Sequence, residues 1–458
     1  MNTKKKFLSF ALACLMLALT FSAAIPVFAA DAVAQIGSTP YTDLDAAFEA
    51  AGEGQTVELL KSEITVTEIK TSNKNAFTVQ PVEGLASVTI TTTNDSIMSS
   101  GSTTSNSIVF NNVNFVQASK KNDNTDNTSA FMIIRGGSKY TFNNCTFTTG
   151  INTTTNTGFG TYASPFISNG STTATNGAKG GELIMNDCTI NYNNSTAELA
   201  LFSSNTDLYP FAIKLNNVNI NTSNKQSIFR MSSKMTVDIT GTTTVKNNDG
   251  DYTGDFITEA IYNNAARHGG TVNILNGKTY GGFEAPTLVD GASVRTTAGS
   301  NGLRFKASLP ASVIANEDVT EYGMLFARTA SVSGEFTETA LADGTYIMSK
   351  ADTAKTVDGV FTFALTDIAE DNYNTMYSAR AYAKYNSCKA TILVYSTYTV
   401  ADNSRSLAGV AKMATEDFSP TYDAENGYIC KIADGKYSPY DKNQLAVLTT
   451  YADKYVAE

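Results

Sequence analysis

Two residue types are nearly missing from this chain of 458 residues: there is no tryptophan, and there is one histidine, His268. Because His268 lies in the stretch AARHGG, we expect it in a loop. Since the chain has this one histidine and we do not expect it to be a catalyst, we exclude Ser-His-Asp triads, histidine dyads and zinc sites with several histidines. Sugar binding on a tryptophan platform is excluded too, although the chain has 22 tyrosines that would also stack on sugars.

Cysteine is also scarce, with five residues in the whole chain. Four of them follow the first 29 residues: Cys145, Cys188, Cys388 and Cys430. Cys145 and Cys188 occupy the same slot in two copies of a repeat, and we expect them to be small buried hydrophobic residues; a bridge between them is the alternative. Cys388 and Cys430 form the better disulfide candidate, because nothing in the local pattern buries either one.

Long apolar runs are missing except at the N-terminus. Three lysines precede an apolar run over 7–21, and Val27-Phe28-Ala29 fits the small-x-small cleavage rule. This pattern predicts a signal peptide over 1–29 and a secreted or cell-surface protein. A transmembrane anchor is the alternative, which Pro26 and the polar chain after it disfavour. No second run of about 18 apolar residues follows, so we expect no membrane insertion after cleavage.

Basic residues are too few for a nucleic-acid partner. Cleavage after Ala29 removes three of the 33 basic residues and none of the 43 acidic ones, which leaves a formal charge of −13. Phosphate contacts need clustered lysine and arginine, so nucleic acid is not an expected partner. The charge serves solubility.

One short sequence motif occurs four times with small changes: IVFNNVNF, YTFNNCTF, LIMNDCTI and IKLNNVNI. Its amide pairs begin at Asn111, Asn143, Asn186 and Asn216, so the spacing varies from 30 to 43 residues. Repeated motifs that are separated by loops of variable length are typical of a solenoid. Further short apolar strands lie between the copies, such as FMIIRGG over 131–137. Each unit therefore has three short strands.

These units predict an all-β fold, a parallel β-helix with three short strands per coil. Asparagine tolerates the left-handed backbone of a tight turn, and stacked amides hydrogen-bond in a ladder. We expect Asn111, Asn143, Asn186 and Asn216 to form this ladder. Behind it we expect two inward stacks, namely Val113, Cys145, Cys188 and Val218, and Phe115, Phe147, Ile190 and Ile220. A helix over 42–55 should cap the open N-terminal end.

The strand–helix–strand start followed by asparagine-paired coils resembles the secreted pectate-lyase-like right-handed parallel β-helix proteins of Gram-positive-type bacteria. The resemblance covers roughly residues 31–290. It implies the architecture but not an activity, because the same fold hosts lyases, hydrolases, adhesins and proteins of no known activity. We therefore expect a β-helix domain over 30–290.

The composition changes near Asp290, where longer alternating strands begin. The motifs GASVR, GLRF, YGMLF, ARAYAKY and NSRSLAGVA resemble a recurrent, uncharacterised β-sandwich module of secreted bacterial proteins. The resemblance implies an accessory or attachment domain, which we expect over 291–415. A C-terminal extension over 416–458 follows, and its last helix should begin after Asp441.

One stretch, NNDGDYTGDF, has the pattern of a cation-binding loop. Asn247, Asp249, Asp251 and Asp255 offer hard oxygen ligands that suit Ca²⁺. We nevertheless prefer a turn rich in asparagine, aspartate and glycine that holds no metal, because such turns are common in loops, and keep the calcium site as the alternative. The resemblance to lyases also implies a basic residue near the acidic ligands, and the candidates for catalysis are Arg230 and Glu259.

The sequence favours a non-catalytic binding protein of the cell surface or exterior. A glycan or another surface component is the expected partner, because a long flat β-face with few charges suits an extended polymer. Tyr192, Tyr209 and Tyr252 are candidates for a sugar-stacking face. A polysaccharide-degrading enzyme, either a Ca²⁺-dependent lyase or a glycoside hydrolase, is the alternative, and a structural spacer is a third. The sequence does not fix the oligomeric state.

Overall fold

The computed structural model describes most of the chain after residue 30. The described residues are 31–71, 73–92, 97–100, 105–117, 131–134, 136–149, 166–168, 180–192, 200–204, 209–222, 227–247, 250–257, 269–332, 334, 336–337, 346–350, 358–387, 390–416, 418–423, 427–432 and 440–457. The predicted signal peptide, Cys388, Asp249, Glu259 and His268 lie outside them. The protein is mostly β-strand, with parallel pairing dominant in its first part, as an all-β prediction requires.

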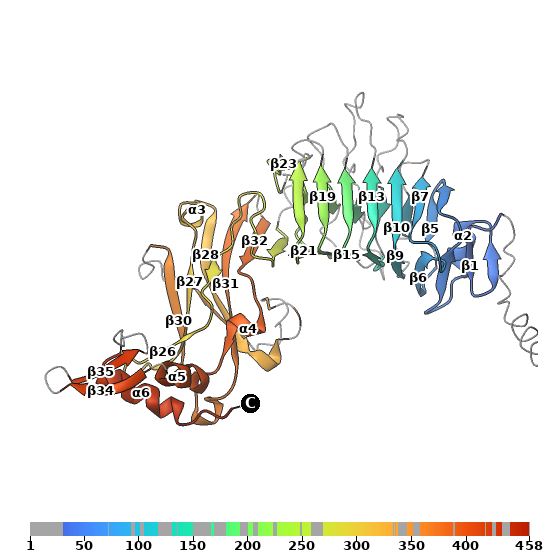
Figure 1. Ribbon diagram of the computed structural model, residues 1–458. Helices are drawn as coiled ribbons and strands as arrows, with labels where there is room; N and C mark the ends of the chain where they lie inside the picture. Colours follow the sequence, from blue (N-terminus) through green and yellow to red (C-terminus); the bar gives the residue numbers. More distant parts are fainter. Residues whose placement is uncertain are drawn as a thin grey trace, which may run out of the picture.

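Three sheets make up the first part of the protein (Figure 1). Sheet 1 contains β3 (Thr56–Leu59), β6 (Ala76–Pro81), β9 (Ser107–Asn111), β12 (Lys139–Asn143), β15 (Gly181–Asn186), β18 (Phe211–Asn216), β21 (Met235–Thr240) and β24 (Thr271–Ile274). Sheet 2 contains β4 (Glu63–Val66), β7 (Val88–Thr92), β10 (Val113–Gln117), β13 (Thr146–Thr149), β16 (Thr189–Tyr192), β19 (Asn219–Thr222) and β22 (Thr244–Asn247). Sheet 3 contains β5 (Ile69–Thr71), β8 (Met98–Ser100), β11 (Met132–Ile133), β14 (Phe166–Ser168), β17 (Phe202–Ser204) and β20 (Phe229–Arg230).

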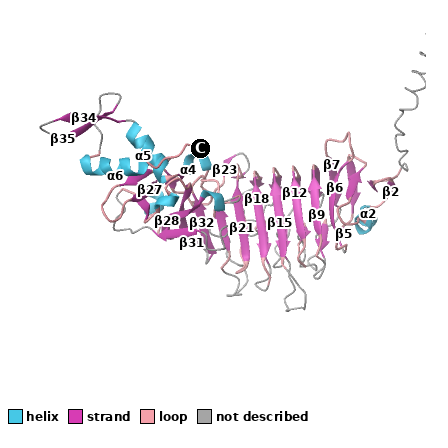
Figure 2. Cartoon of the chain, turned by 90° about the horizontal axis from the view of Figure 1, so that it is seen from below, coloured by secondary structure: helices cyan, strands magenta, loops and turns pink. Residues whose placement is uncertain are grey.

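The chain visits these sheets in a fixed order, so that β9, β10 and β11 belong to sheets 1, 2 and 3, and β12 returns to sheet 1. We call one such passage a coil. Successive coils pair in parallel and in register; Asn111 lies opposite Asn143, and Phe115 opposite Phe147. Figure 2 shows the resulting row of strands side by side.

The interior of the coils is a set of side-chain stacks. Both predicted inward stacks are confirmed, since all eight residues are at most 1% exposed. Phe115 stacks on Phe147 with ring centroids 5.1 Å apart, and Phe166 stacks on Phe202 at 5.2 Å. Alternate side chains of a strand point to opposite faces, so one face of each short strand fills this core and the other faces outward.

Cys145 and Cys188 belong to this core. Both are buried and free, as the hydrophobic interpretation predicts. The Cys188 thiol lies 3.4 Å from the Phe142 carbonyl oxygen. The neighbouring Cys188 thiol and burial raise the pKa of Cys145 far above its ordinary value. The same contact with Cys145 lowers the pKa of Cys188. Both thiols are at most 1% exposed in the core, so we interpret the pair as packing. Cys388 lies outside the described residues, so the disulfide to Cys430 stays a prediction.

The amide pairs form the corner between sheets 1 and 2. The second residue of each pair has a left-handed backbone, with φ between 53° and 55° at Asn112, Asn144, Asp187 and Asn217. Three of the first residues, Asn111, Asn143 and Asn186, form the predicted ladder, whereas Asn216 Oδ1 accepts a hydrogen bond from the Thr240 hydroxyl at 3.1 Å. Asn143 Nδ2 donates to Asn111 Oδ1 at 2.8 Å, and Asn186 Nδ2 donates to Asn143 Oδ1 at 2.9 Å. The repeated motif therefore forms a corner that is stabilised by side-chain hydrogen bonds between neighbouring coils.

A second ladder runs along the left-handed residues and has one interruption. Asn144 Nδ2 donates to Asn112 Oδ1 at 2.6 Å, and Asn217 Nδ2 donates to Asp187 Oδ1 at 3.1 Å. The Asp187 carboxylate accepts from Asn217 but has no N–H to donate to the Asn144 amide oxygen, so in the described structure the ladder is interrupted between Asn144 and Asp187.

Replacing Asp187 with asparagine should complete this second ladder. The new amide would donate to Asn144 Oδ1 and still accept from Asn217, and asparagine keeps the left-handed backbone. We expect the free energy of unfolding to rise by about 0.5–1 kcal/mol, the usual net value of a hydrogen bond. Urea denaturation followed by circular dichroism measures this change. Asp187→Ala is the comparison, since it removes the acceptor and should destabilise; a stability of the asparagine variant at or below the native value would contradict the prediction.

The N-terminal end of the coils is covered by α2 (Leu44–Ala50), as the sequence predicts. Asp43 caps this helix by accepting from the Asp45 backbone N–H, and Leu44, Ala47 and Phe48 are buried. Asn73 fixes the helix end, because its Nδ2 donates to the carbonyl oxygens of Phe48 and Ala51 at 2.7 Å each. Strand β1 (Ala34–Ile36) joins the edge of sheet 1 beside β3 in the antiparallel sense.

At the other end, sheet 1 continues into the C-terminal part. Strand β24 pairs in parallel with β32 (Ala390–Tyr395), and antiparallel β31 (Tyr377–Ser387), β28 (Val319–Arg328) and β29 (Tyr346–Lys350) follow. A second antiparallel sheet contains β25 (Thr287–Leu288), β26 (Ser293–Arg295), β27 (Gly302–Ser308) and β30 (Val360–Thr366). Phe326 of the first sheet packs on Phe305 and Phe363 of the second, with ring centroids 5.8 and 6.2 Å apart.

The remaining elements of this part are short: α3 (Ala311–Ile314), α4 (Val400–Asn403), β33 (Ser404–Arg405), α5 (Leu407–Glu416), and the hairpin of β34 (Phe418–Asp423) and β35 (Gly427–Ile432). The last helix, α6 (Lys442–Ala452), begins after Asp441 with a capping box, as predicted. Leu448 and Tyr451 of this helix are buried, whereas Tyr455 lies past its end. Because sheet 1 crosses residue 290, the domain division at that point stays a prediction.

Arg380 connects the two parts. Its side chain is 1% exposed and donates hydrogen bonds to the carbonyl oxygens of Ser396, Phe336 and Leu275. Its guanidinium carbon lies 5.2 Å from the centroid of the Tyr395 ring. Leu275 directly follows β24, the last strand of sheet 1 before the C-terminal part. One buried cation therefore holds the last coil against the strands that cover it.

Tyr385 forms a second connection, since its hydroxyl donates to the Glu284 carbonyl oxygen at 2.8 Å. Burial raises the pKa of Tyr385 to about 12, above the value of about 10 of an unfolded tyrosine. Its contribution to stability is therefore complete below pH 10 and is lost as the pH rises from 10 toward 12. We expect the slope of unfolding free energy against pH in this window to be shallower in Tyr385→Phe, measured by urea denaturation at intervals from pH 8 to 11. Equal slopes in the two proteins would contradict this assignment.

Candidate binding surface

The three sheets present different outward faces. On sheet 3, Phe202 and Phe229 stack inside, with ring centroids 5.4 Å apart. Ser203 and Arg230, which alternate with them, therefore lie on the outward side, yet they are only 0% and 7% exposed. Ile133 of β11 is 7% exposed in the same position. At these three described positions the face offers no exposed surface to a large ligand.

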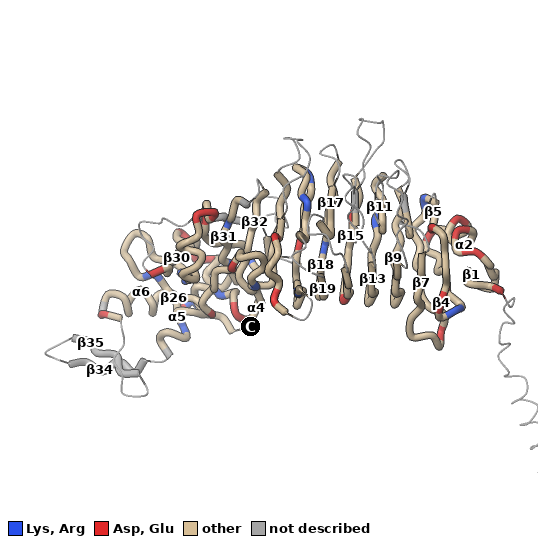
Figure 3. The backbone as a smooth tube through the Cα atoms, turned by 90° about the horizontal axis from the view of Figure 1, so that it is seen from above, with Lys and Arg blue, Asp and Glu red and all other residues tan. Residues whose placement is uncertain are grey.

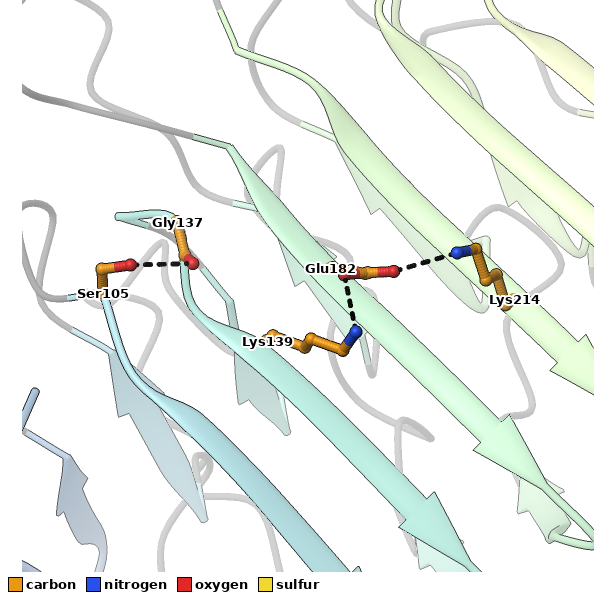
Figure 4. A network of polar contacts seen from close by, with 5 residues as sticks. All are labelled: Ser105, Gly137, Lys139, Glu182 and Lys214. Carbon is orange, nitrogen blue, oxygen red and sulfur yellow. Dashed lines mark hydrogen bonds and ion pairs between the residues drawn. The ribbon is translucent and has the colours of Figure 1, made fainter. Parts of the chain in front are cut away.

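The outward face of sheet 1 carries charges. Glu182 lies between two lysines, with Lys139 Nζ at 3.3 Å and Lys214 Nζ at 3.2 Å from its carboxylate (Figure 4). Partial burial opposes ionisation of Glu182, but the hydrogen bond from Lys214 and the charge of Lys139 outweigh it and lower its pKa. Farther along, Asn273 Nδ2 donates to Asp238 Oδ1 at 2.7 Å. A stripe of alternating charges therefore crosses this sheet.

The outward face of sheet 2 is open and uncharged over five consecutive strands, β7 to β19. We call it the threonine–asparagine face. It consists of Thr89, Thr91, Asn114, Val116, Thr146, Thr148, Thr189, Asn191, Asn219 and Asn221. All ten are at least partly exposed. Charged side chains on this side of the described strands lie at its two ends, with Glu63 on β4 and Lys246 on β22 opposite Asp251, and Figure 3 shows how sparse charges are along the stacked strands.

This face is a regular array. Neighbouring strands lie about 4.8 Å apart, and alternate residues of one strand are about 6.7 Å apart. In-register pairing keeps equivalent positions aligned, so Thr91, Val116, Thr148, Asn191 and Asn221 form one rank. The other five residues form a second rank parallel to it. The face therefore repeats the same two outward positions at each of these coils, and nine of the ten side chains are polar.

Hydrogen bonds along the ranks hold some of these side chains in fixed orientations. Asn221 Nδ2 donates to Asn191 Oδ1 at 2.9 Å, and the Thr244 hydroxyl donates to Asn219 Oδ1 at 2.9 Å. At the other end, Asn114 Nδ2 lies 3.4 Å from the Ser87 hydroxyl. A ligand that binds here meets polar groups that have already lost much of their rotational freedom.

The predicted calcium loop is only partly described. Strand β23 (Gly250–Asp251) folds back on β22, which places Asp251 opposite Lys246. The Tyr252 hydroxyl donates a hydrogen bond to the Asp255 carbonyl oxygen at 2.7 Å. Burial and the charge of Asp255 raise the pKa of Tyr252 above its ordinary value. Among the described residues, no group of three or more His, Cys, Asp or Glu side chains lies together as metal ligands would. Since Asp249 is not described, the calcium site stays a prediction.

The catalytic pair of the enzyme alternative stays a prediction. Arg230 is buried on β20, and Ile257 of the next coil pairs with its neighbour Phe229. Glu259 lies outside the described residues. The prediction of a sugar-stacking tyrosine face is wrong for Tyr192, which is fully buried and continues the inward side of β16 after Ile190. Its hydrophobic ring fills the core, so it has no surface for a sugar.

The sequence already contains a signal for the threonine–asparagine face. The interpretation of these segments as corners and loops does not use it. In SVTIT over 87–91 and in CTFT over 145–148, polar and apolar residues alternate with a period of two. Thr89 and Thr91 therefore share the outward side of one strand, and Thr146 and Thr148 share that of another, whereas the next threonines, Thr92 and Thr149, are buried. This period shows that the polar positions form a continuous face as soon as the coils are placed in register.

Comparisons with known proteins give no relative: no protein family matches the chain, and no curated protein sequence is similar to it. No helix in the described part of the chain is both long and apolar enough to cross a membrane.

Proposed function

We propose that this is a secreted or cell-surface protein that binds a glycan without catalysis. In this proposal residues 1–29 are its signal peptide. Residues 30–290 form a right-handed parallel β-helix that carries the binding surface. Residues 291–415 form a β-sandwich with an accessory role, and 416–458 are its extension.

The observation that supports this proposal best is the open, uncharged face of sheet 2. Five strands present hydroxyl and amide groups in two ranks, and a polysaccharide offers hydroxyl groups at regular intervals. Hydrogen bonds between the two are neutral and numerous. Nucleic acid lacks this complementarity, because its phosphates need lysine and arginine.

A screen of the mature protein tests the proposal. Its retention on plant and microbial glycans is measured together with the release of reducing ends and unsaturated products, once with Ca²⁺ and once with chelator. We expect retention on at least one glycan with no cleavage. Cleavage that requires Ca²⁺ and disappears in Asp251→Ala would replace the proposal with a polysaccharide lyase. Neither retention nor cleavage would leave a structural spacer as the better account.

A further inference from the structure

We infer that the threonine–asparagine face binds an ordered surface of neutral polysaccharide chains, with affinity that single oligosaccharides and acidic polymers lack. This inference rests on the proposed function and specifies its site and its ligand class. Three properties of the face carry it: its charge, its repeat and its lack of apolar anchors.

Charge complementarity favours a neutral ligand. The face has no charged side chain from β7 to β19, whereas the outward side of sheet 1 has Lys139, Glu182, Lys214 and Asp238. An acidic polymer would have no cation to pair with on this face. It would also approach a protein whose mature chain has 30 basic and 43 acidic residues. A neutral polymer avoids both costs.

The repeat favours a ligand that is itself periodic. From β7 to β19 the face offers the same two positions at five levels, about 4.8 Å apart, over roughly 19 Å. A globular protein partner has no such period on its surface. Parallel chains of a polysaccharide do, so the same contact can form again at successive coils.

The lack of apolar anchors favours an ordered surface over a single short chain. Val116 is the only apolar side chain of the face, and none of the exposed large hydrophobic residues of the described structure lies on it. Protein interfaces depend on a few buried aromatic or aliphatic anchors, which are missing here. Each hydroxyl or amide contact contributes little by itself, about 1 kcal/mol. Useful affinity therefore requires many simultaneous contacts and a ligand that is already ordered.

The test compares two double variants with the same chemistry on different faces. Thr91→Glu with Thr148→Glu places two carboxylates on the threonine–asparagine face. Thr78→Glu with Thr141→Glu places them on the outward side of sheet 1 in the same two coils, where both threonines are also partly exposed. The two variants have equal charge and start from the same residue type. Circular dichroism and thermal unfolding confirm that each is folded.

Binding to microcrystalline cellulose and to chitin powder is measured by sedimentation, and binding to cellohexaose, chitohexaose and polygalacturonate by calorimetry. We expect the native protein to be retained on at least one of the two powders, and neither hexasaccharide nor polygalacturonate to bind. We expect the Thr91/Thr148 variant to lose about tenfold or more in affinity for the powder, and the Thr78/Thr141 variant to lose less than about twofold. Retention of the native protein should also be unchanged by 0.5 M NaCl, because no ionic contact is screened.

Equal retention of both variants and the native protein would overturn the inference, and so would tight binding of a hexasaccharide, or retention that high salt abolishes. Binding only to an acidic polymer would overturn it as well, while the proposed function would stand. A native protein that is retained on no glycan of the wider screen would overturn both. The salt measurement uses the native protein alone, so the inference stays testable if a variant does not fold.

Discussion

Replacing Arg380 with leucine should destabilise the C-terminal part more than any other single substitution in it. The variant leaves the carbonyl oxygens of Ser396, Phe336 and Leu275 buried without their donor. Each unsatisfied buried group costs about 1–3 kcal/mol. We expect a loss of about 3–5 kcal/mol in the free energy of unfolding, measured by chemical denaturation with circular dichroism.

Because one of these carbonyls belongs to Leu275, the effect should include weaker attachment of the C-terminal part to the last coil. Limited proteolysis of the Arg380→Leu protein should release a fragment that contains the coils. Arg328→Leu is the matched control, since Arg328 is exposed and its hydrogen bond to Asn372 is long, at 3.3 Å. It should change stability by less than about 0.5 kcal/mol. Similar stabilities of the two variants would show that Arg380 does not connect the parts.

The second large effect is expected at Phe147. Its ring is fully buried and meets four others, those of Phe115, Phe142, Phe166 and Phe131, at centroid distances of 5.0–6.4 Å. Phe147→Ala should cost about 3–5 kcal/mol, the usual range for a buried phenylalanine, because the rings of neighbouring coils cannot collapse into the cavity.

Thr148→Ala is the control for Phe147, because it is the next residue of the same strand and points outward. It should change stability by no more than about 0.5 kcal/mol. Phe147→Leu should fall between the two. Each coil contacts only its neighbours, so Phe147→Ala should also broaden the urea transition as the coils begin to unfold separately. A loss below about 1 kcal/mol in the alanine variant would mean that the stack does not contribute to the core as described.

The coil architecture was accessible from the sequence because it depends on local and repeated signals. The amide pairs at Asn111, Asn143, Asn186 and Asn216 predicted the ladder and the inward stacks; hydrogen bonds confirm the ladder from Asn111 to Asn186, and burial confirms the stacks. The capped helix before the first coil and the helix after Asp441 were predicted from capping residues and apolar spacing. Each of these signals lies within a few residues of the structure it predicts.

Features that depend on distant residues were not accessible. The parallel pairing of β24 with β32 joins residues more than 100 positions apart, and neither strand shows which partner it will have. In ARAYAKY, Arg380 is one residue of an alternating strand, and only the carbonyls contributed by other segments explain why it is buried. Tyr192 is a different case: its spacing of two from Ile190 already places it on the inward side, which the interpretation as a sugar-stacking residue overlooked.

The corner ladder also bears on how proteins of this design can change in size. Each corner bonds only to the corners before and after it, and every coil contributes the same two outward positions to sheet 2. The gain or loss of one copy, 30 to 43 residues in this chain, would lengthen or shorten the array by a single step of about 4.8 Å while its chemistry stayed the same. The number of copies is thus a quantity on which selection can act separately from the identity of any residue.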